Sequence, residues 1–177
     1  MLIALCVVLP LAFHQVPRAG SILLPMHIPV LLAGLVCGWK FGLITGLSGP
    51  ILSTMITGMP PTMAIASLMS IEMGVYGLVA GVLAYIVKTK SATLDLYICL
   101  VVSMIAGRLV AGIAQYTFFF SSDDGSRYTM ALWISSYFVT SLPGIVIQLA
   151  FVPSVVMALE RERVIPLRYP IKAMETV

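Results

Sequence analysis

Charged residues are scarce in this chain. Asp, Glu, Lys and Arg make up 10% of its 177 residues, whereas hydrophobic residues make up 60%. A soluble domain averages about 25% charged residues, which supply much of the surface that faces water. So little charge leaves too little polar surface for a soluble protein. The composition therefore predicts an integral membrane protein, and we expect no nucleic-acid partner.

Residues that ligate metals or form disulfides are also few. The three cysteines, Cys6, Cys37 and Cys99, all lie in apolar stretches, and the only histidines are His14 and His27. An odd number of cysteines without a spacing pattern favours buried free thiols. Two histidines without nearby carboxylates or cysteines make a poor metal site. We expect neither a metal nor a cofactor.

The sequence contains no motif for energy conversion or for peptide-bond cleavage. It has no P-loop and no GxGxxG stretch. The GLSG stretch at residues 46–49 resembles the nucleophile motif of rhomboid intramembrane proteases, in which a histidine from a later helix acts as the base. Here both histidines precede Ser48, so no later residue can serve as that base. The sequence therefore argues against an enzyme.

The hydrophobic residues fall into six segments. A membrane-spanning helix needs about 20 mainly apolar residues, and the runs are too continuous for the alternating strands of a membrane barrel. The connecting loops are too short to hold a soluble domain. We predict an all-α, single six-helix membrane domain over residues 1–177, with a cytoplasmic tail at 160–177 and spans at roughly 1–16, 21–39, 41–57, 61–87, 94–120 and 129–159.

The basic residues are distributed unequally between the two sides of this arrangement. With the N-terminus inside, the outer loops carry Arg18 and Arg127, and the inner side carries Lys40, Lys88, Lys90, Arg161, Arg163, Arg168 and Lys172. Loops on the cytoplasmic side of a membrane are enriched in Lys and Arg. The pattern predicts a multi-pass protein with both termini in the cytoplasm.

Glycines recur at every fourth position around the second and third segments, at Gly34, Gly38, Gly42 and Gly46. This spacing places small residues on one helix face, where two backbones can approach closely in lipid. One interpretation is simple packing between helices of this chain. The other is a smooth face that slides against a partner protein.

Two ionisable residues, Glu72 and Arg108, lie inside predicted spans, where charge is costly and usually functional. At the rise of a helix, Glu72 lies about 18 Å inward from Pro60 and Arg108 about 12 Å inward from Tyr116. The difference between the two depths is smaller than the combined reach of the two side chains. Either the two residues form a buried ion pair, or they line a polar cavity that opens outward and holds a substrate.

Further polar and aromatic residues share these faces. Tyr76 is one turn from Glu72, and Gln115 is two turns from Arg108. Trp133 and Tyr137 stand on the sixth segment, and the first outer loop brings His27 near the mouth of the outer side. A lining of aromatic and polar residues with few charges suits a small organic ligand.

The longest motif-like region reads LLPMHIPVLLAGLVCGWKFGLITGLSGPILSTMITGMPP and is followed by IEMGVYGLVAGVLA. Together with the six-span layout, it resembles the substrate-binding S components of energy-coupling factor (ECF) transporters, which take up vitamins in prokaryotes. The resemblance covers essentially the whole chain. It implies a prokaryotic cell-membrane protein whose ligand pocket opens outward and is capped by the first outer loop. The implied pocket is formed by helices four to six, which fits the positions of Glu72, Tyr76, Arg108, Gln115, Trp133 and Tyr137. His27, placed near the mouth, is a further predicted substrate-binding residue.

The resemblance also implies partners. An S component associates with an EcfT-like membrane coupling subunit and two cytoplasmic ATPases, and it topples in the membrane to release its substrate inside. Family members often dock through an AxxxA motif on the first helix, where this chain has Ala4 and Val8. Because valine replaces the second alanine, the glycine face from Gly34 to Gly46 is the next docking candidate.

Two other functions fit the same sequence. The chain would be a self-sufficient secondary carrier if Glu72 served as a proton site, or a membrane scaffold if it bound no small molecule. Arginine would suit a carboxylate on a ligand, and glutamate an amine or hydroxyl. If the two residues pair with each other, neither inference holds, and the sequence does not identify the substrate.

Overall fold

The computed structural model describes residues 1–12, 25–89, 91–120 and 135–162, and within these ranges every regular element is a helix. The prediction of an all-helical protein is thereby confirmed. The α-helices are α1 (Leu2–Ala12), α3 (His27–Leu32), α4 (Trp39–Thr57), α5 (Met63–Ile86), α6 (Ala92–Phe120) and α8 (Leu142–Arg161), and the short π-helices are η1 (Ala33–Cys37) and η3 (Ser135–Thr140).

One of these α-helices lies within or largely overlaps each of the six predicted segments. Three helices are long and apolar enough to cross a membrane, over Met63–Ile86, Ala92–Phe118 and Leu142–Arg161. The first two segments hold shorter apolar helices, Leu2–Ala12 and His27–Cys37. Large apolar side chains such as Phe41, Met55 and Ile113 are exposed on the outside of the bundle, as expected of a surface that faces lipid.

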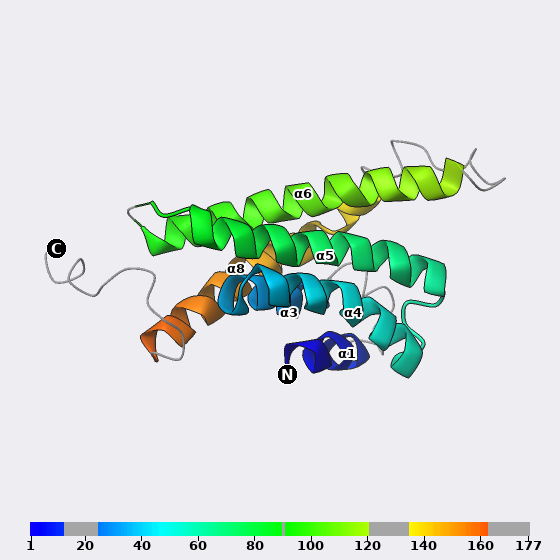
Figure 1. Cartoon of the computed structure of the whole chain (residues 1–177), viewed down its shortest axis with the longest axis horizontal. Coiled ribbons are helices and arrows are strands. Elements are labelled where there is room, and N and C mark those ends of the chain that lie inside the picture. The colour runs from blue at the N-terminus through cyan, green and yellow to red at the C-terminus, as the bar shows by residue number, and fades with distance from the viewer. Residues whose placement is uncertain (13–24, 90, 121–134, 163–177) are drawn as a thin grey trace, which may run out of the picture.

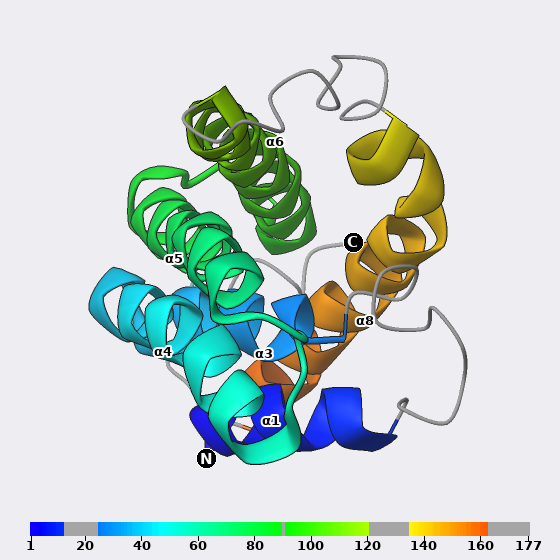
Figure 2. The same ribbon diagram turned by 90° about the vertical axis from the view of Figure 1, so that its right-hand side faces the viewer.

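Helix α3 lies at the centre of the bundle. Figures 1 and 2 show α4, α5 and α6 side by side, with α1 and α8 on the other side of α3, and α3 contacts α1, α4, α5 and α8. Four of its six residues are buried: His27, Pro29, Val30 and Leu31. A segment surrounded in this way must be apolar on every side, and the sequence HIPVLL meets this requirement except at His27.

A sharp turn at Gly38 sends the chain from η1 back along itself into α4. Gly38 has a φ of 95°, a conformation that residues with a side chain rarely adopt. The turn lets η1 and α4 pack together against α5. The residue before it, Cys37, is exposed, so the prediction of a buried thiol is wrong there, although it is correct for Cys6 and Cys99.

The regularly spaced glycines mediate this packing. A Cβ atom on Gly34 or Gly42 would overlap the carbonyl oxygen of Gly77 in α5, and one on Gly46 would overlap the carbonyl oxygen of Met73. Helix backbones approach this closely only where side chains are absent. The glycine face at these three positions is thus covered by α5 and is not open to a partner subunit in this structure. The spacing reflects packing within the chain.

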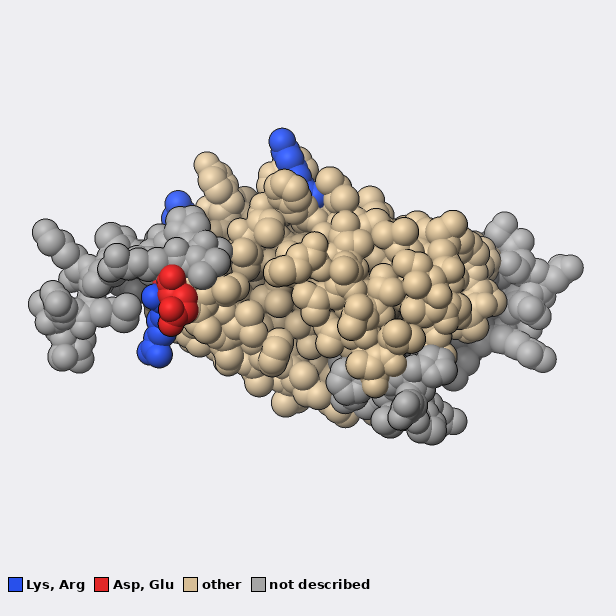
Figure 3. All heavy atoms as spheres, turned by 90° about the horizontal axis from the view of Figure 1, so that it is seen from below, with Lys and Arg blue, Asp and Glu red and all other residues tan. Residues whose placement is uncertain are grey.

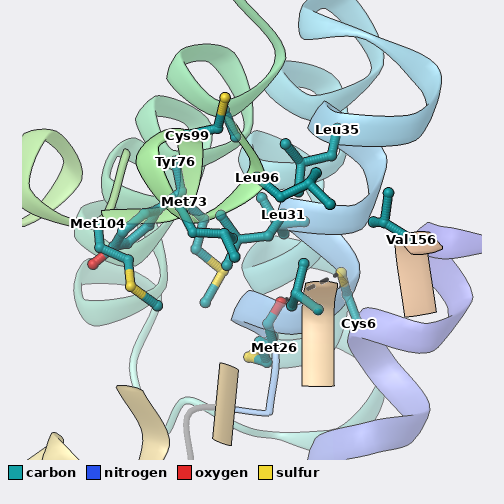
Figure 4. Packing of buried hydrophobic residues seen from close by; sticks show 14 residues of the cluster. Cys6, Met26, Leu31, Leu35, Met73, Tyr76, Leu96, Cys99, Met104 and Val156 are labelled. Carbon is teal, nitrogen blue, oxygen red and sulfur yellow. Dashed lines mark hydrogen bonds between the residues drawn. The ribbon is translucent and has the colours of Figure 1, made fainter. Parts of the chain in front are cut away.

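One hydrophobic core joins the helices. Figure 4 shows Leu31 of α3 among Met73 and Tyr76 of α5 and Leu96 of α6. Cys6 of α1 also belongs to this core and is fully buried. Because α3 contributes to the core from its centre, the polar residue at its start is drawn into the interior.

Candidate functional site

Four polar side chains meet inside this apolar bundle, which we call the polar cluster: His27, Glu72, Tyr76 and Arg108. They come from the start of α3, the middle of α5 and the middle of α6. Tyr76 is 1% exposed, His27 and Arg108 are each 3% exposed, and Glu72 is 6% exposed. All four were among the predicted substrate-binding residues. His27, however, was expected near the mouth of the outer side, whereas the structure buries it.

Local helix geometry and one glycine bring these residues together. Glu72 and Tyr76 are four residues apart and therefore share a face of α5. Gly107 of α6 lets the two helices approach at this level, because a Cβ atom there would lie 3.1 Å from ring atoms of Tyr76. Arg108 follows directly on α6. From the other side, the His27 ring meets the Tyr76 ring edge to face, with centroids 5.0 Å apart and planes at 68°.

Tyr76 links the two ionisable residues. The Nε of Arg108 donates a hydrogen bond to the Tyr76 hydroxyl oxygen at 3.1 Å. The Tyr76 hydroxyl donates in turn to Oε1 of Glu72 at 3.3 Å. Buried charges need such partners, because an isolated ion in an apolar interior is costly. Glu72 and Arg108 are thus linked through Tyr76, and both predicted arrangements, an ion pair and a cavity lining, remain predictions.

His27 completes the polar cluster on the side of Glu72. Its Nε2 lies 3.9 Å from Oε1 of Glu72. Its other ring nitrogen, Nδ1, is buried and has no hydrogen-bond partner within the described part of the chain. Buried polar atoms are nearly always paired in folded proteins, so this nitrogen marks a position where a further polar group is expected.

The remaining predicted site residues lie elsewhere or outside the described residues. Gln115 is half-buried on α6, two turns beyond Arg108. Tyr137 belongs to η3, but its side chain is not among those described. Trp133 lies in 121–134, outside the described residues. The structure therefore brings together four of the seven predicted residues and leaves the parts played by the other three as predictions.

Gln148 of α8 is a buried polar residue that was not among the predicted site residues. It is 1% exposed. At the rise of a helix, Gln148 lies about 20 Å from the end of α8 at Arg161, and Glu72 about 21 Å from the end of α5 at Ile86. Figure 1 shows these two helix ends toward the same side of the molecule. A glutamine within an otherwise apolar stretch is the sequence signal that could identify this residue.

A hollow among the described residues is lined entirely by apolar side chains. It has a volume of about 360 Å³ and lies between α1, α3 and α8, lined by Leu5, Leu9, Pro25, Ile28, Pro29, Leu32, Ile147 and Phe151. None of these side chains has a hydrogen-bonding group, and none belongs to the polar cluster. A hollow of this kind offers no means to orient a polar ligand. The polar cluster remains the candidate site.

Ser48 has an ordinary local partner. Its hydroxyl donates a hydrogen bond of 2.7 Å to the carbonyl oxygen of Ile44, one turn earlier in α4. Serines within helices commonly make this bond to their own backbone. The GLSG stretch is thus part of the packed helix α4.

Apolar helices with large apolar side chains on their outer surface, around a buried polar cluster, are typical of an integral membrane protein. The family model for the substrate-specific component of ECF transporters matches residues 1–156, and the chain belongs to this family. It is therefore a membrane substrate-binding subunit, as the sequence resemblance predicted. No curated protein and no solved structure matches the chain.

Proposed function

We propose that this subunit binds a vitamin or similar micronutrient outside a prokaryotic cell and delivers it inward after docking to an EcfT-like coupling subunit and two cytoplasmic ATPases. The observation that carries the proposal is the buried polar cluster in a chain of this family. Its four side chains supply both hydrogen-bond donors and acceptors in apolar surroundings, as specific recognition of a small molecule requires. The chain contributes recognition, and its partners contribute the energy.

The proposal includes six spans with both termini in the cytoplasm. Lys40 near the start of α4, Lys88 just after α5 and Arg161 at the end of α8 occupy helix ends that lie toward one side of the bundle in Figure 1. In Figure 3 the charged side chains lie in the left-hand half, and the rest of the described surface on that face carries none. This separation supports a cytoplasmic end and a lipid-facing body.

Two aromatic residues support the same position for the boundary between the membrane and the cytoplasm. The Nζ of Lys40 lies 5.5 Å from the ring centroid of Trp39, and the Nζ of Lys88 lies 5.7 Å from that of Tyr85. Both rings are exposed. Trp, Tyr and Lys gather where a membrane meets water, so these pairs fit a membrane interface at the inner ends of α4 and α5.

Docking to the coupling subunit is proposed through α1. Ala4 and Val8 are one turn apart and both are exposed, whereas Cys6 between them faces the core. The glycines proposed as the next candidate are less suitable, since Gly34, Gly42 and Gly46 pack against α5. Only Gly38 of that set is partly exposed. The outward face of α1 is accordingly the better docking surface.

We predict that Ala4→Trp separates binding from transport. The bulky side chain would obstruct the docking face without touching the polar cluster, so substrate affinity should stay unchanged while ATP-dependent uptake falls at least tenfold. Co-purification of the coupling subunit and uptake in proteoliposomes measure the two effects. Ile113→Trp, at an exposed position on α6, is the matched control and should transport normally. Equal uptake by both variants would rule out docking through α1.

Reconstitution tests the proposed function as a whole. Proteoliposomes that contain the chain, the coupling subunit and both ATPases should accumulate substrate only when ATP is present. Uptake by the chain alone, driven by a pH gradient and abolished by Glu72→Gln, would instead support a secondary carrier. The 3.9 Å approach of His27 to Glu72 makes that alternative worth testing. A chain that binds no small molecule would be a scaffold.

A further inference from the structure

The unpaired nitrogen of His27 indicates what kind of group the substrate presents. Nδ1 of His27 is buried and lacks a hydrogen-bond partner among the described residues. Leaving a buried polar atom unpaired is destabilising. The other side chains of the polar cluster have partners in the structure. The cluster is therefore complete except at this one atom.

The position of Glu72 determines whether Nδ1 donates or accepts. A neutral imidazole carries one proton, and the partner of one nitrogen selects which nitrogen holds it. Nε2 is the nitrogen beside the Glu72 carboxylate, at 3.9 Å, and a carboxylate favours the proton on the nearer nitrogen. Nδ1 is then left with its lone pair and accepts a hydrogen bond.

The charges of the polar cluster restrict the charge of the ligand. Glu72 contributes one negative charge and Arg108 one positive charge, and Tyr76 joins them. These two charges sum to zero. Two other carboxylates in the described part of the chain are buried, Asp95 and Glu160, and both lie far from the cluster. Asp95 is about 20 Å from Arg108 along α6, and Glu160 is next to the end of α8.

A ligand with a net charge would disturb this balance. The four side chains are at most 6% exposed, so water does little to stabilise an additional ion among them. An unpaired ion in such a site is costly. A neutral ligand avoids that cost and still gains a hydrogen bond to the free acceptor.

We propose that the substrate has no net charge at neutral pH and donates an O–H or N–H hydrogen bond to Nδ1 of His27. This inference rests on the proposed function, because it assumes that the polar cluster is where the substrate binds. It narrows the substrate class to net-neutral micronutrients that carry a hydroxyl or an uncharged N–H group. Compounds whose recognition depends on a carboxylate are excluded.

Binding measurements on the purified full-length chain test the substrate class. Calorimetry with two net-neutral hydroxyl-bearing vitamins (pyridoxine and riboflavin) and two carboxylate vitamins (nicotinate and biotin), with mass spectrometry of any co-purified molecule, should identify a net-neutral ligand with a donor. A ligand with a net charge would overturn this inference and leave the proposed function standing. If none of the four binds and nothing co-purifies, the proposed function fails as well.

Substitutions at His27 test the role of its Nδ1 atom. The affinity of each variant is measured for the compound that the wild-type chain binds. His27→Phe keeps a ring against Tyr76 but removes Nδ1, so affinity should fall tenfold to a hundredfold. His27→Asn places an amide near the position of Nδ1, where its oxygen can accept, and should retain most of the affinity. His14→Phe, at the other histidine, should bind as the wild type does.

The unfolding midpoint of each variant separates recognition from structure. A merely structural role for His27 predicts that affinity follows the midpoint, whichever residue is introduced. The proposal predicts instead that His27→Asn binds better than His27→Phe even where their midpoints agree. Wild-type affinity in His27→Phe, or equal loss of affinity in both variants at a native midpoint, would overturn it.

Discussion

Replacing Gly77 by alanine is expected to destabilise the bundle by about 2–3 kcal/mol, near the upper end of the usual cost of overpacking a core. A Cβ atom at this position would overlap the carbonyl group of Gly42. The obstacle is backbone, which cannot rotate away as a side chain can. Alanine favours a helix by about 1 kcal/mol relative to glycine, but that gain is smaller than the loss of packing when α4 and α5 separate.

Reversible unfolding of the purified chain in denaturant measures this effect. Gly74→Ala is the matched control, since it makes the same change on the same helix. There the added Cβ would lie 3.0 Å from Cδ2 of Leu47, the far end of a side chain that can move. We expect a change within about 1 kcal/mol for Gly74→Ala. Comparable destabilisation by both substitutions would show that backbone contact is not what makes Gly77 necessary.

The second large effect is expected for Arg108→Ala, which should weaken substrate binding at least a hundredfold while membrane insertion continues. Removing the guanidinium deprives Tyr76 of its hydrogen-bond donor and leaves the Glu72 carboxylate buried without that positive charge. Leaving a buried charge without its compensating partner in this way typically costs about 3–5 kcal/mol. The variant should therefore also unfold at a lower denaturant concentration. Binding calorimetry and unfolding of the purified protein measure the two losses.

A double variant tests whether Glu72 and Arg108 only hold α5 and α6 together or also contact the substrate. Glu72→Gln combined with Arg108→Gln removes both charges and leaves amides that can still bond to Tyr76. Stability should recover relative to Arg108→Gln alone, because no uncompensated charge stays buried. Substrate binding should remain weak if the charged groups contact the ligand. Recovery of both stability and binding would mean that the pair only fixes α5 to α6.

Local sequence patterns were enough to predict the helices and part of the polar cluster. Glu72 and Tyr76 stand four residues apart, and this spacing alone places them on one face of α5. The six apolar segments likewise predicted where helices occur, because a helix satisfies its own backbone within one stretch of chain. The regular spacing of Gly34, Gly42 and Gly46 predicted a smooth helix face, because small residues at this spacing lie on one side of a helix.

The local patterns did not show which other helices these faces would contact. The glycine face was expected to pack or to slide against a partner, and only the fold shows that α5 covers Gly34, Gly42 and Gly46. His27 was expected at the outer mouth, yet the turn at Gly38 and the central position of α3 bury it beside Glu72. The position of His27 depends on the packing of every helix that surrounds α3.

The sequence by itself determined that this is a helical membrane protein of a substrate-binding family, because scarce charge, long apolar runs and a long family motif are properties of composition and order along the chain. Only the tertiary structure decided how the charges are arranged. The bridge from Arg108 to Tyr76 joins residues 32 positions apart, and His27 is more distant still from the residues it meets. Contacts over such separations form only when whole helices have packed.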